Sequence, residues 1–105
     1  MQNAHAFVAE LNKQFEAAQP TNPNRPVFYV TSGPVYDKVC HRDAIFADKH
    51  GGAVFCFVNA SGEVFKAAGW KSPAKGVRAH LSDITPEFVA KIVDAGYATT
   101  GWLYR

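Results

Sequence analysis

Two cysteines and the histidines around them are the residues whose chemistry could support catalysis. Cys40 is followed directly by His41, and a thiol beside an imidazole is the pair that a cysteine nucleophile needs. Adjacent residues of a β-strand point to opposite faces, so this pair cannot work together if the segment is a strand. A small thiol-dependent enzyme would instead pair Cys40 or Cys56 with a distant histidine, His50 or His80, and would need an exposed thiol of lowered pKa. The alternative is that both cysteines are small buried side chains.

The same side chains do not have the spacing of a metal or cofactor site. They lack the close Cys-x-x-Cys and His-x-x-x-His pairs that organise tetrahedral zinc ligands. Gly51 and Gly52 precede an expected strand, whereas a phosphate-binding glycine loop opens a helix. Asp83 and Glu87 lie at the start of an expected helix, where acidic side chains meet the positive end of the helix dipole. We therefore assign no catalytic residue and expect neither a metal ion nor a cofactor.

The segment from Val64 to Ser82 differs in charge from the rest of the chain. It contains four basic residues and no acidic residue, although the net charge of the whole chain is only +2. It also contains a tryptophan directly before a lysine. Stacking of bases on an indole and neutralisation of phosphates by lysine and arginine are the components of single-stranded nucleic-acid contacts. The predicted binding residues are Lys66, Trp70, Lys71, Lys75 and Arg78.

The partner predicted for this segment is a nucleic acid or an acidic protein surface, which would make the chain a small non-enzymatic binding protein. A structural interpretation competes with this prediction. Trp70 would then pack against the edge of the sheet, and the lysines would only keep an irregular loop in contact with water.

Residues 27–80 contain a pattern of short motifs. They are Phe28-Tyr-Val30, Gly33-Pro-Val-Tyr-Asp-Lys-Val39, and the string from Phe57 through Lys66, Trp70, Pro73 and Lys75 to Arg78. This pattern resembles small uncharacterised proteins encoded by tailed bacteriophages, in which a basic residue often stands where this chain has Pro34-Val35. The resemblance implies a phage setting inside a bacterial host, and it implies no particular reaction.

Length and composition are those of one compact domain, residues 1–105. Hydrophobic residues make up 48% of the chain and charged residues 19%, which is typical of globular proteins and unlike disordered ones. The longest unbroken apolar run, Ala53 to Val58, is far shorter than the roughly 20 residues that cross a bilayer. The first residues lack the basic start and apolar block of a signal peptide. We therefore expect a cytoplasmic protein without a membrane helix.

Helical periodicity marks both ends of the chain. Apolar residues recur at spacings of three and four over residues 3–18, with Asn3 as the expected cap and Pro20 as the stop. A second, short helix is predicted over residues 86–95, where Thr85-Pro86 provides the start. Residues 43–50 are predicted to include a short helical turn.

Strand patterns fill the region between the helices. The expected strands cover residues 27–30, 36–41, 53–58 and 63–67, and Asn59 to Gly62 has the sequence of a type I turn that joins the last two as a hairpin. The strand over 53–58 is expected in the centre, with Phe55 and Phe57 on one face and Cys56 on the other. Because neither face of 36–41 is uniformly apolar, that strand is expected at an edge.

The fold class is therefore α+β, with an N-terminal helix, an antiparallel sheet of three to five strands around a central hairpin, and a short C-terminal helix. The tail over residues 97–105 is rich in aromatic residues and is expected to pack or pair. An edge strand together with this tail could form a two-fold interface, so a self-associating structural protein is a third hypothesis, with a homodimer as its product.

Overall fold

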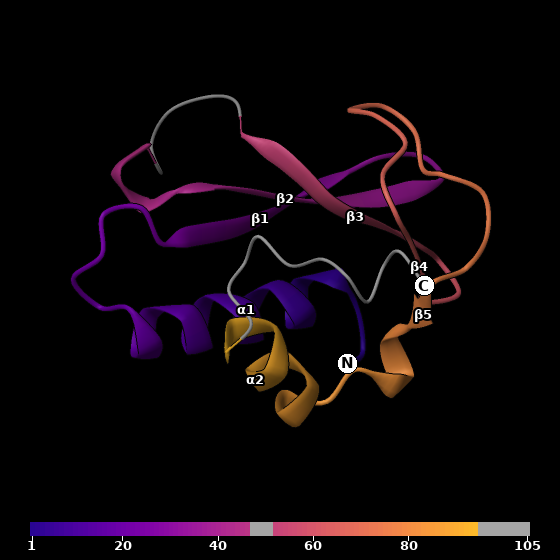
Figure 1. Ribbon diagram of the computed structural model, residues 1–105. Helices are drawn as coiled ribbons and strands as arrows, with labels where there is room; N and C mark the ends of the chain where they lie inside the picture. Colours follow the sequence, from indigo (N-terminus) through magenta and orange to yellow (C-terminus); the bar gives the residue numbers. More distant parts are fainter. Residues whose placement is uncertain (47–51, 95–105) are drawn as a thin grey trace.

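The computed structural model describes residues 1–46 and 52–94, in which helices cover one side of an antiparallel sheet (Figure 1). The elements in chain order are α1 (Ala4–Ala18), β1 (Pro26–Ser32), β2 (Tyr36–Asp43), the 3₁₀ helix η1 (Ala44–Phe46), β3 (Ala53–Asn59), β4 (Glu63–Phe65), β5 (Ala79–His80), the 3₁₀ helix η2 (Leu81–Asp83) and α2 (Pro86–Asp94). This is the predicted α+β architecture.

Helix α1 begins and ends where local chemistry requires. The Asn3 side chain accepts a hydrogen bond from the Ala6 N–H at 2.8 Å and caps the first turn, as predicted. At the other end, the Gln19 N–H donates to the Phe15 carbonyl at 2.8 Å, and Pro20 cannot continue the helix. The stripe of α1 that faces the sheet is buried and consists of Ala4, Phe7, Val8, Leu11 and Phe15.

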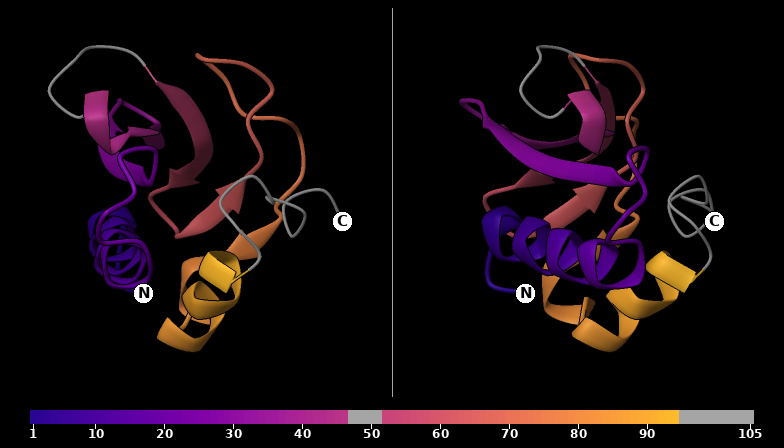
Figure 2. Two further views of the ribbon diagram at one scale, coloured as in Figure 1. Left: turned by 60° about the vertical axis from the view of Figure 1, so that its left-hand side comes forward. Right: turned by 90° about the vertical axis from the view of Figure 1, so that its left-hand side faces the viewer.

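Helix α2 lies beside α1 and completes the helical layer (Figure 2). Its start matches the prediction, since Thr85 Oγ1 accepts a hydrogen bond from the Phe88 N–H at 3.1 Å. Val89, Ile92 and Val93 are its buried residues and join the same core as α1.

The strands form one antiparallel sheet in the order β1-β2-β3-β4-β5. The prediction that residues 36–41 form an edge strand is wrong, because β2 pairs with β1 on one side and with β3 on the other. The polar residues misled the prediction because the ends of their side chains have partners within the fold. Lys38 and Arg42, for example, both pack over aromatic rings.

The turn between β3 and β4 forms as predicted. The Gly62 N–H donates to the Asn59 carbonyl at 3.0 Å, and Asn59 Oδ1 accepts from the N–H groups of Ser61 at 3.1 Å and Glu63 at 2.9 Å. Gly62 has a φ of +83°, and a Cβ at this position would meet the His80 ring at 3.1 Å. Glycine is therefore required both by the backbone conformation and by the space.

An irregularity in β3 decides which of its side chains enter the core. Val39 pairs with Cys56, but Cys40 pairs with Val54, so Phe55 is an extra residue in the ladder. Phe55 and Cys56 consequently both lie in the core under the helices. The prediction that Phe55 shares a face with Phe57 is therefore wrong.

Helix α1 also covers part of the β1 edge. The Asn12 side-chain amide donates to the Phe28 carbonyl at 2.9 Å, and the Phe28 N–H donates to Asn12 Oδ1 at 2.7 Å. This pair of bonds imitates the contact that a neighbouring strand would make, so the edge at Phe28 is closed to another chain.

The 97–105 tail and the end of the turn predicted over 43–50 lie outside the described residues, whereas the start of that turn is η1. Within the ranges 1–46 and 52–94, no helix has the length and apolar character needed to cross a membrane.

Candidate binding face

The loop over residues 66–78 rises on the side of the sheet opposite the helices, here called the outer face (Figure 1). Backbone hydrogen bonds fold the loop back on itself. The Ala74 N–H donates to the Lys66 carbonyl at 2.7 Å, and the N–H groups of Ala68 and Gly69 donate to the Ser72 carbonyl at 3.1 and 3.3 Å. These bonds place Trp70 at the tip of the loop.

Trp70 is neither a buried plug nor a fully exposed side chain. Its exposed fraction is 47%, and Lys38 Nζ lies 4.2 Å from the centroid of its ring. Lys38 belongs to β2, so this cation–π contact attaches the loop to the outer face of the sheet. The indole therefore has a defined position while much of its surface remains in contact with water.

A cleft of about 410 Å³ opens beside this contact, between the β1–β2 turn and the loop. Its lining contains two lysines, Lys38 and Lys71, and no acidic residue. The full lining is Thr31, Ser32, Gly33, Pro34, Val35, Tyr36, Lys38, Phe57, Lys71, Ser72 and Pro73. The cleft thus combines positive charge, hydroxyl groups and an apolar wall.

Aromatic packing holds the wall of the cleft in place. Tyr36 meets Phe57 edge to face at a centroid distance of 6.0 Å and Phe65 at 5.7 Å. Phe57 is buried although it lies outside the main core, because the outer face has this small aromatic cluster of its own.

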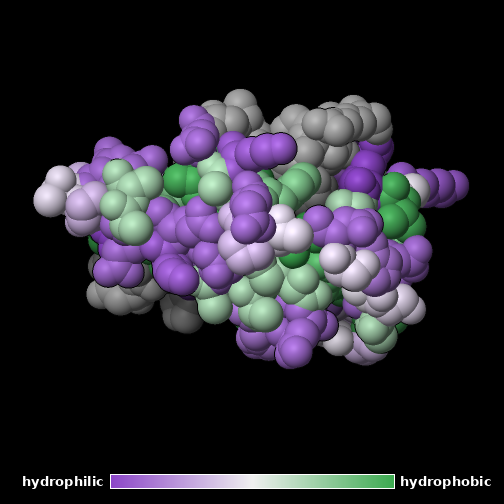
Figure 3. All heavy atoms as spheres, turned by 90° about the horizontal axis from the view of Figure 1, so that it is seen from below, coloured by the Kyte–Doolittle hydropathy of each residue, from purple (hydrophilic) through white to green (hydrophobic). Residues whose placement is uncertain are grey.

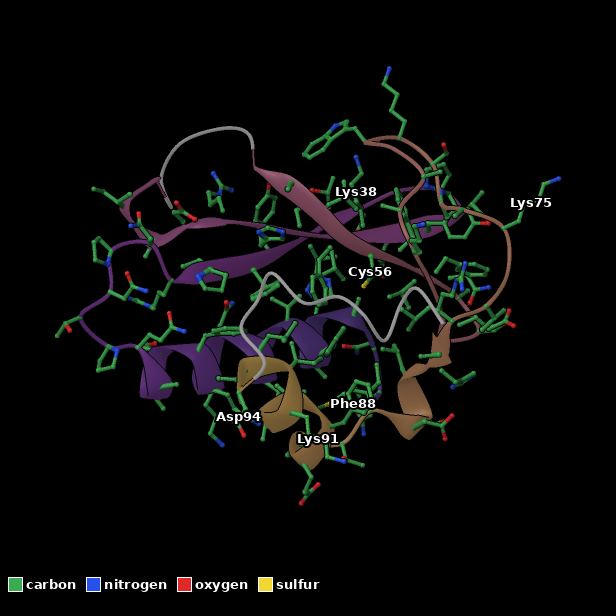
Figure 4. All side chains as sticks on the ribbon, in the orientation of Figure 1. Lys38, Cys56, Lys75, Phe88, Lys91 and Asp94 are labelled. Atoms are coloured by element: carbon green, nitrogen blue, oxygen red, sulfur yellow. The ribbon has the colours of Figure 1, made fainter. Side chains whose placement is uncertain are left out.

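The structure brings together only some of the residues predicted to bind. Lys71 lines the cleft, and Trp70 contacts Lys38 at the edge of the cleft, whereas Lys75 projects away from the molecule (Figure 4). Lys66 and Arg78 are half-buried at the base of the loop. The predicted site is thus split between the cleft and a separate exposed lysine.

Three further residues of this face were absent from the predicted site. Lys38 lines the cleft, and Arg42 Cζ lies 4.2 Å from the centroid of the Tyr29 ring on the same face. The available signal was the alternation in β2, which places Lys38 and Arg42 four residues apart on one face. It could not have shown that the 66–78 loop lies above them.

The helices and the rest of the described chain differ in net charge. The helical layer, formed by α1, η2 and α2, has a net charge of −3, from Lys13 and Lys91 against Glu10, Glu16, Asp83, Glu87 and Asp94. The described sheet and loops have a net charge of +4, from Arg25, Lys38, Arg42, Lys66, Lys71, Lys75 and Arg78 against Asp37, Asp43 and Glu63. The surface seen from below, where the helices lie, is largely hydrophilic with smaller hydrophobic patches (Figure 3). An anionic partner would therefore be attracted more strongly to the sheet and its loops than to the helical layer.

The two thiols lack the surroundings of a nucleophile. Both Cys40 and Cys56 are fully buried. Burial raises the pKa of Cys40 against smaller opposing effects from hydrogen bonds with Tyr29 and Thr31, and burial raises the pKa of Cys56 far more. A thiolate is disfavoured at both positions, which argues against a thiol-dependent enzyme.

The two histidines described near the strands, His41 and His80, do not supply the missing base. His41 points to the helix side, where its ring contacts Phe28 and Phe55, while Cys40 is on the outer face, as the strand alternation predicts. His80 Nδ1 accepts a hydrogen bond from the Ser82 N–H at 3.2 Å and caps η2. His50 is outside the described residues.

Among the side chains that the structure describes, no three His, Cys, Asp or Glu residues converge as metal ligands would. A second hollow of about 300 Å³ lies between α1 and α2. None of its lining side chains is a lysine or an arginine; they are Gln14, Ala17, Ala18, Ala90, Val93 and Asp94. The cleft of the outer face is therefore the better candidate for recognition.

Comparison with known proteins places the chain in a family without assigning a reaction. Searches of curated proteins and of solved structures find no match. A protein-family model matches residues 1–105, which include the N-terminal helix that the phage-protein resemblance did not cover. The chain therefore belongs to a family of unknown function (DUF7717).

Proposed function

We propose that this protein is a non-enzymatic binding module that contacts an anionic macromolecule, a nucleic acid or an acidic protein surface, through its outer face. The observation that carries this proposal is the juxtaposition of the half-exposed Trp70, the Lys38 ammonium 4.2 Å from its ring, and the acid-free cleft beside them. The resemblance to phage proteins supports a role as a phage accessory or host-interaction factor in the bacterial cytoplasm.

The contact surface differs from the one predicted from sequence. Lys38 and Lys71 come from β2 and from the loop, and both line one cleft. Two cations held in one concave site concentrate positive potential more than the same charges on a flexible loop. Lys75 is exposed and adds to the overall attraction, but it does not line the cleft.

Heparin provides a test that depends on anionic charge and not on the identity of the partner. We expect the protein to bind a heparin column and to elute at lower salt when both cleft lysines are replaced, in Lys38→Ala/Lys71→Ala. The matched control is Lys13→Ala/Lys91→Ala, which removes the same charge from two exposed positions on the helical layer.

The comparison between the two double variants decides the proposal. A larger decrease in eluting salt for the cleft variant supports recognition by the outer face. Equal decreases for both variants, at unchanged melting temperatures, would show that only net charge matters and would reject the outer face as a binding site.

A further inference from the structure

The cleft has the size and the chemical groups of a site for one nucleotide. Its volume of about 410 Å³ lies within the range of about 300–1,000 Å³ for ligand pockets. Tyr36 and Pro73 offer an apolar wall for a flat base, and Lys38 and Lys71 offer cations for a phosphate. An acidic protein side chain would supply the anion but no flat group to fill the cleft.

A second pair of cation and aromatic ring extends this site along β2. Arg42 packs over Tyr29 in the same way as Lys38 packs over Trp70, each at 4.2 Å from the ring centroid. The strand spacing places Lys38 and Arg42 about 13 Å apart along β2. A single phosphate cannot contact both, whereas a chain of several nucleotides can.

The outer face between these two pairs is free of acidic side chains on β1 and β2. Val27, Tyr29 and Thr31 pair with Arg42, Cys40 and Lys38, and Cys40 is buried. A polyanion that crosses this part of the face therefore meets no opposing charge from these two strands. Trp70, which is 47% exposed, adjoins this path through its contact with Lys38.

We propose that the outer face binds single-stranded nucleic acid, with one nucleotide in the cleft, a neighbouring base stacked on Trp70, and the backbone running along β2 toward Arg42. This inference rests on the proposed function and specifies its partner. A single strand is required because the bases of a duplex are stacked on one another and cannot enter a cleft or stack on a side chain.

Fluorescence anisotropy with short labelled oligonucleotides tests the proposal. Single strands should bind at least about tenfold more tightly than a duplex of the same sequence, because only unstacked bases can use Trp70 and the cleft. With three phosphate contacts, from Lys38, Lys71 and Arg42, log K should fall with log salt at a slope of about −2. Parallel measurements with single-stranded DNA and single-stranded RNA show which of the two binds more tightly, because only RNA offers a 2′-hydroxyl.

Variants of the loop separate stacking from charge. Trp70→Ala should weaken single-strand binding roughly 5- to 150-fold, and Trp70→Phe should restore most of the loss because phenylalanine still stacks. The matched control is Lys75→Ala, on the same loop but pointing away from the face, which should change Kd by less than about threefold.

The outcomes distinguish failure of this inference from failure of the proposed function. Equal affinity for single strands and duplex, or equal losses in Trp70→Ala and Lys75→Ala, would overturn single-strand recognition and leave anion binding intact. Binding to heparin through the cleft without binding to any oligonucleotide would also overturn it and would leave an acidic protein surface as the remaining partner of the proposed function. If the salt concentration of elution from heparin fell equally in Lys38→Ala/Lys71→Ala and in Lys13→Ala/Lys91→Ala, the proposed function itself would be rejected.

Discussion

The two faces of the sheet use aromatic side chains in different ways. On the helix side, four aromatic rings pack in the core and are at most 3% exposed; they are Phe7, Phe15, Phe28 and Phe55. On the outer face, Tyr29 and Trp70 remain partly exposed, and each pairs with a cation on β2. The main core thus lies on one face, whereas the other face combines a small aromatic cluster around Phe57 with rings that a partner can reach.

This difference has a physical reason. A buried ring contributes through the apolar area that it removes from water, about 25 cal/mol per Å², but it is then inaccessible to a partner. A ring covered by a lysine or arginine keeps its position through a cation–π contact worth about 0.5–1 kcal/mol at an exposed site. The outer face therefore presents ordered aromatic rings that remain accessible to a partner.

The largest effect is expected from a change on the helix side. Phe15→Ala should lower the free energy of unfolding by about 3–5 kcal/mol, because Phe15 is fully buried and packs on Phe28 at a centroid distance of 5.6 Å. Urea denaturation followed by circular dichroism measures this loss. A loss below about 1 kcal/mol would contradict the assignment of the main core to this face.

The Asn12 contact with the β1 edge should have the next largest effect. Asn12→Ala removes both hydrogen bonds to the Phe28 backbone and should cost about 1–3 kcal/mol. Asn12→Asp keeps the acceptor for the Phe28 N–H but loses the donor to its carbonyl, so it should still protect that amide from hydrogen exchange better than alanine does. Unchanged exchange of the Phe28 amide in Asn12→Ala would show that this edge does not depend on the side chain.

A smaller loss of stability is expected from the outer face. Trp70→Ala should lower the free energy of unfolding by only about 0.5–1 kcal/mol, since the ring is 47% exposed and is held by a cation–π contact with Lys38. Urea denaturation beside Phe15→Ala gives the comparison. A loss of 3 kcal/mol or more would mean that Trp70 packs as a structural plug and would remove the contrast between the two faces.

The smallest expected effect depends on pH and concerns His41. Burial lowers the pKa of His41, with a smaller opposing effect from Asp43. As pH falls below the ordinary histidine value of about 6.5, the unfolded chain takes up the proton first, so the folded state loses stability. Above that pH both states hold neutral imidazole, and this contribution vanishes.

His41→Phe should therefore flatten part of the stability decrease between about pH 7 and about pH 5. Urea midpoints measured across this range test the assignment. Identical pH profiles for the wild type and His41→Phe would exclude His41 as the responsible group.

The sequence alone determined the features that depend on neighbours a few residues apart. The Asn3 cap, the stop at Pro20, the Thr85 start of α2 and the turn at Asn59 to Gly62 all use hydrogen bonds or backbone restrictions within about one turn of chain. Apolar periodicity likewise identified the buried stripe of α1. Such signals can be read directly because both partners lie in the same short segment.

Only the tertiary structure decided the features that depend on register and on distant segments. The bulge moves the Phe55 side chain from the expected outer face into the core, and it appears only when β3 is aligned with β2. The cleft requires Lys38 and Lys71, from positions 33 residues apart, to meet beside Trp70. The positions of charges along the chain do not reveal such a meeting, because it depends on how the 66–78 loop closes over the sheet after the strands have paired.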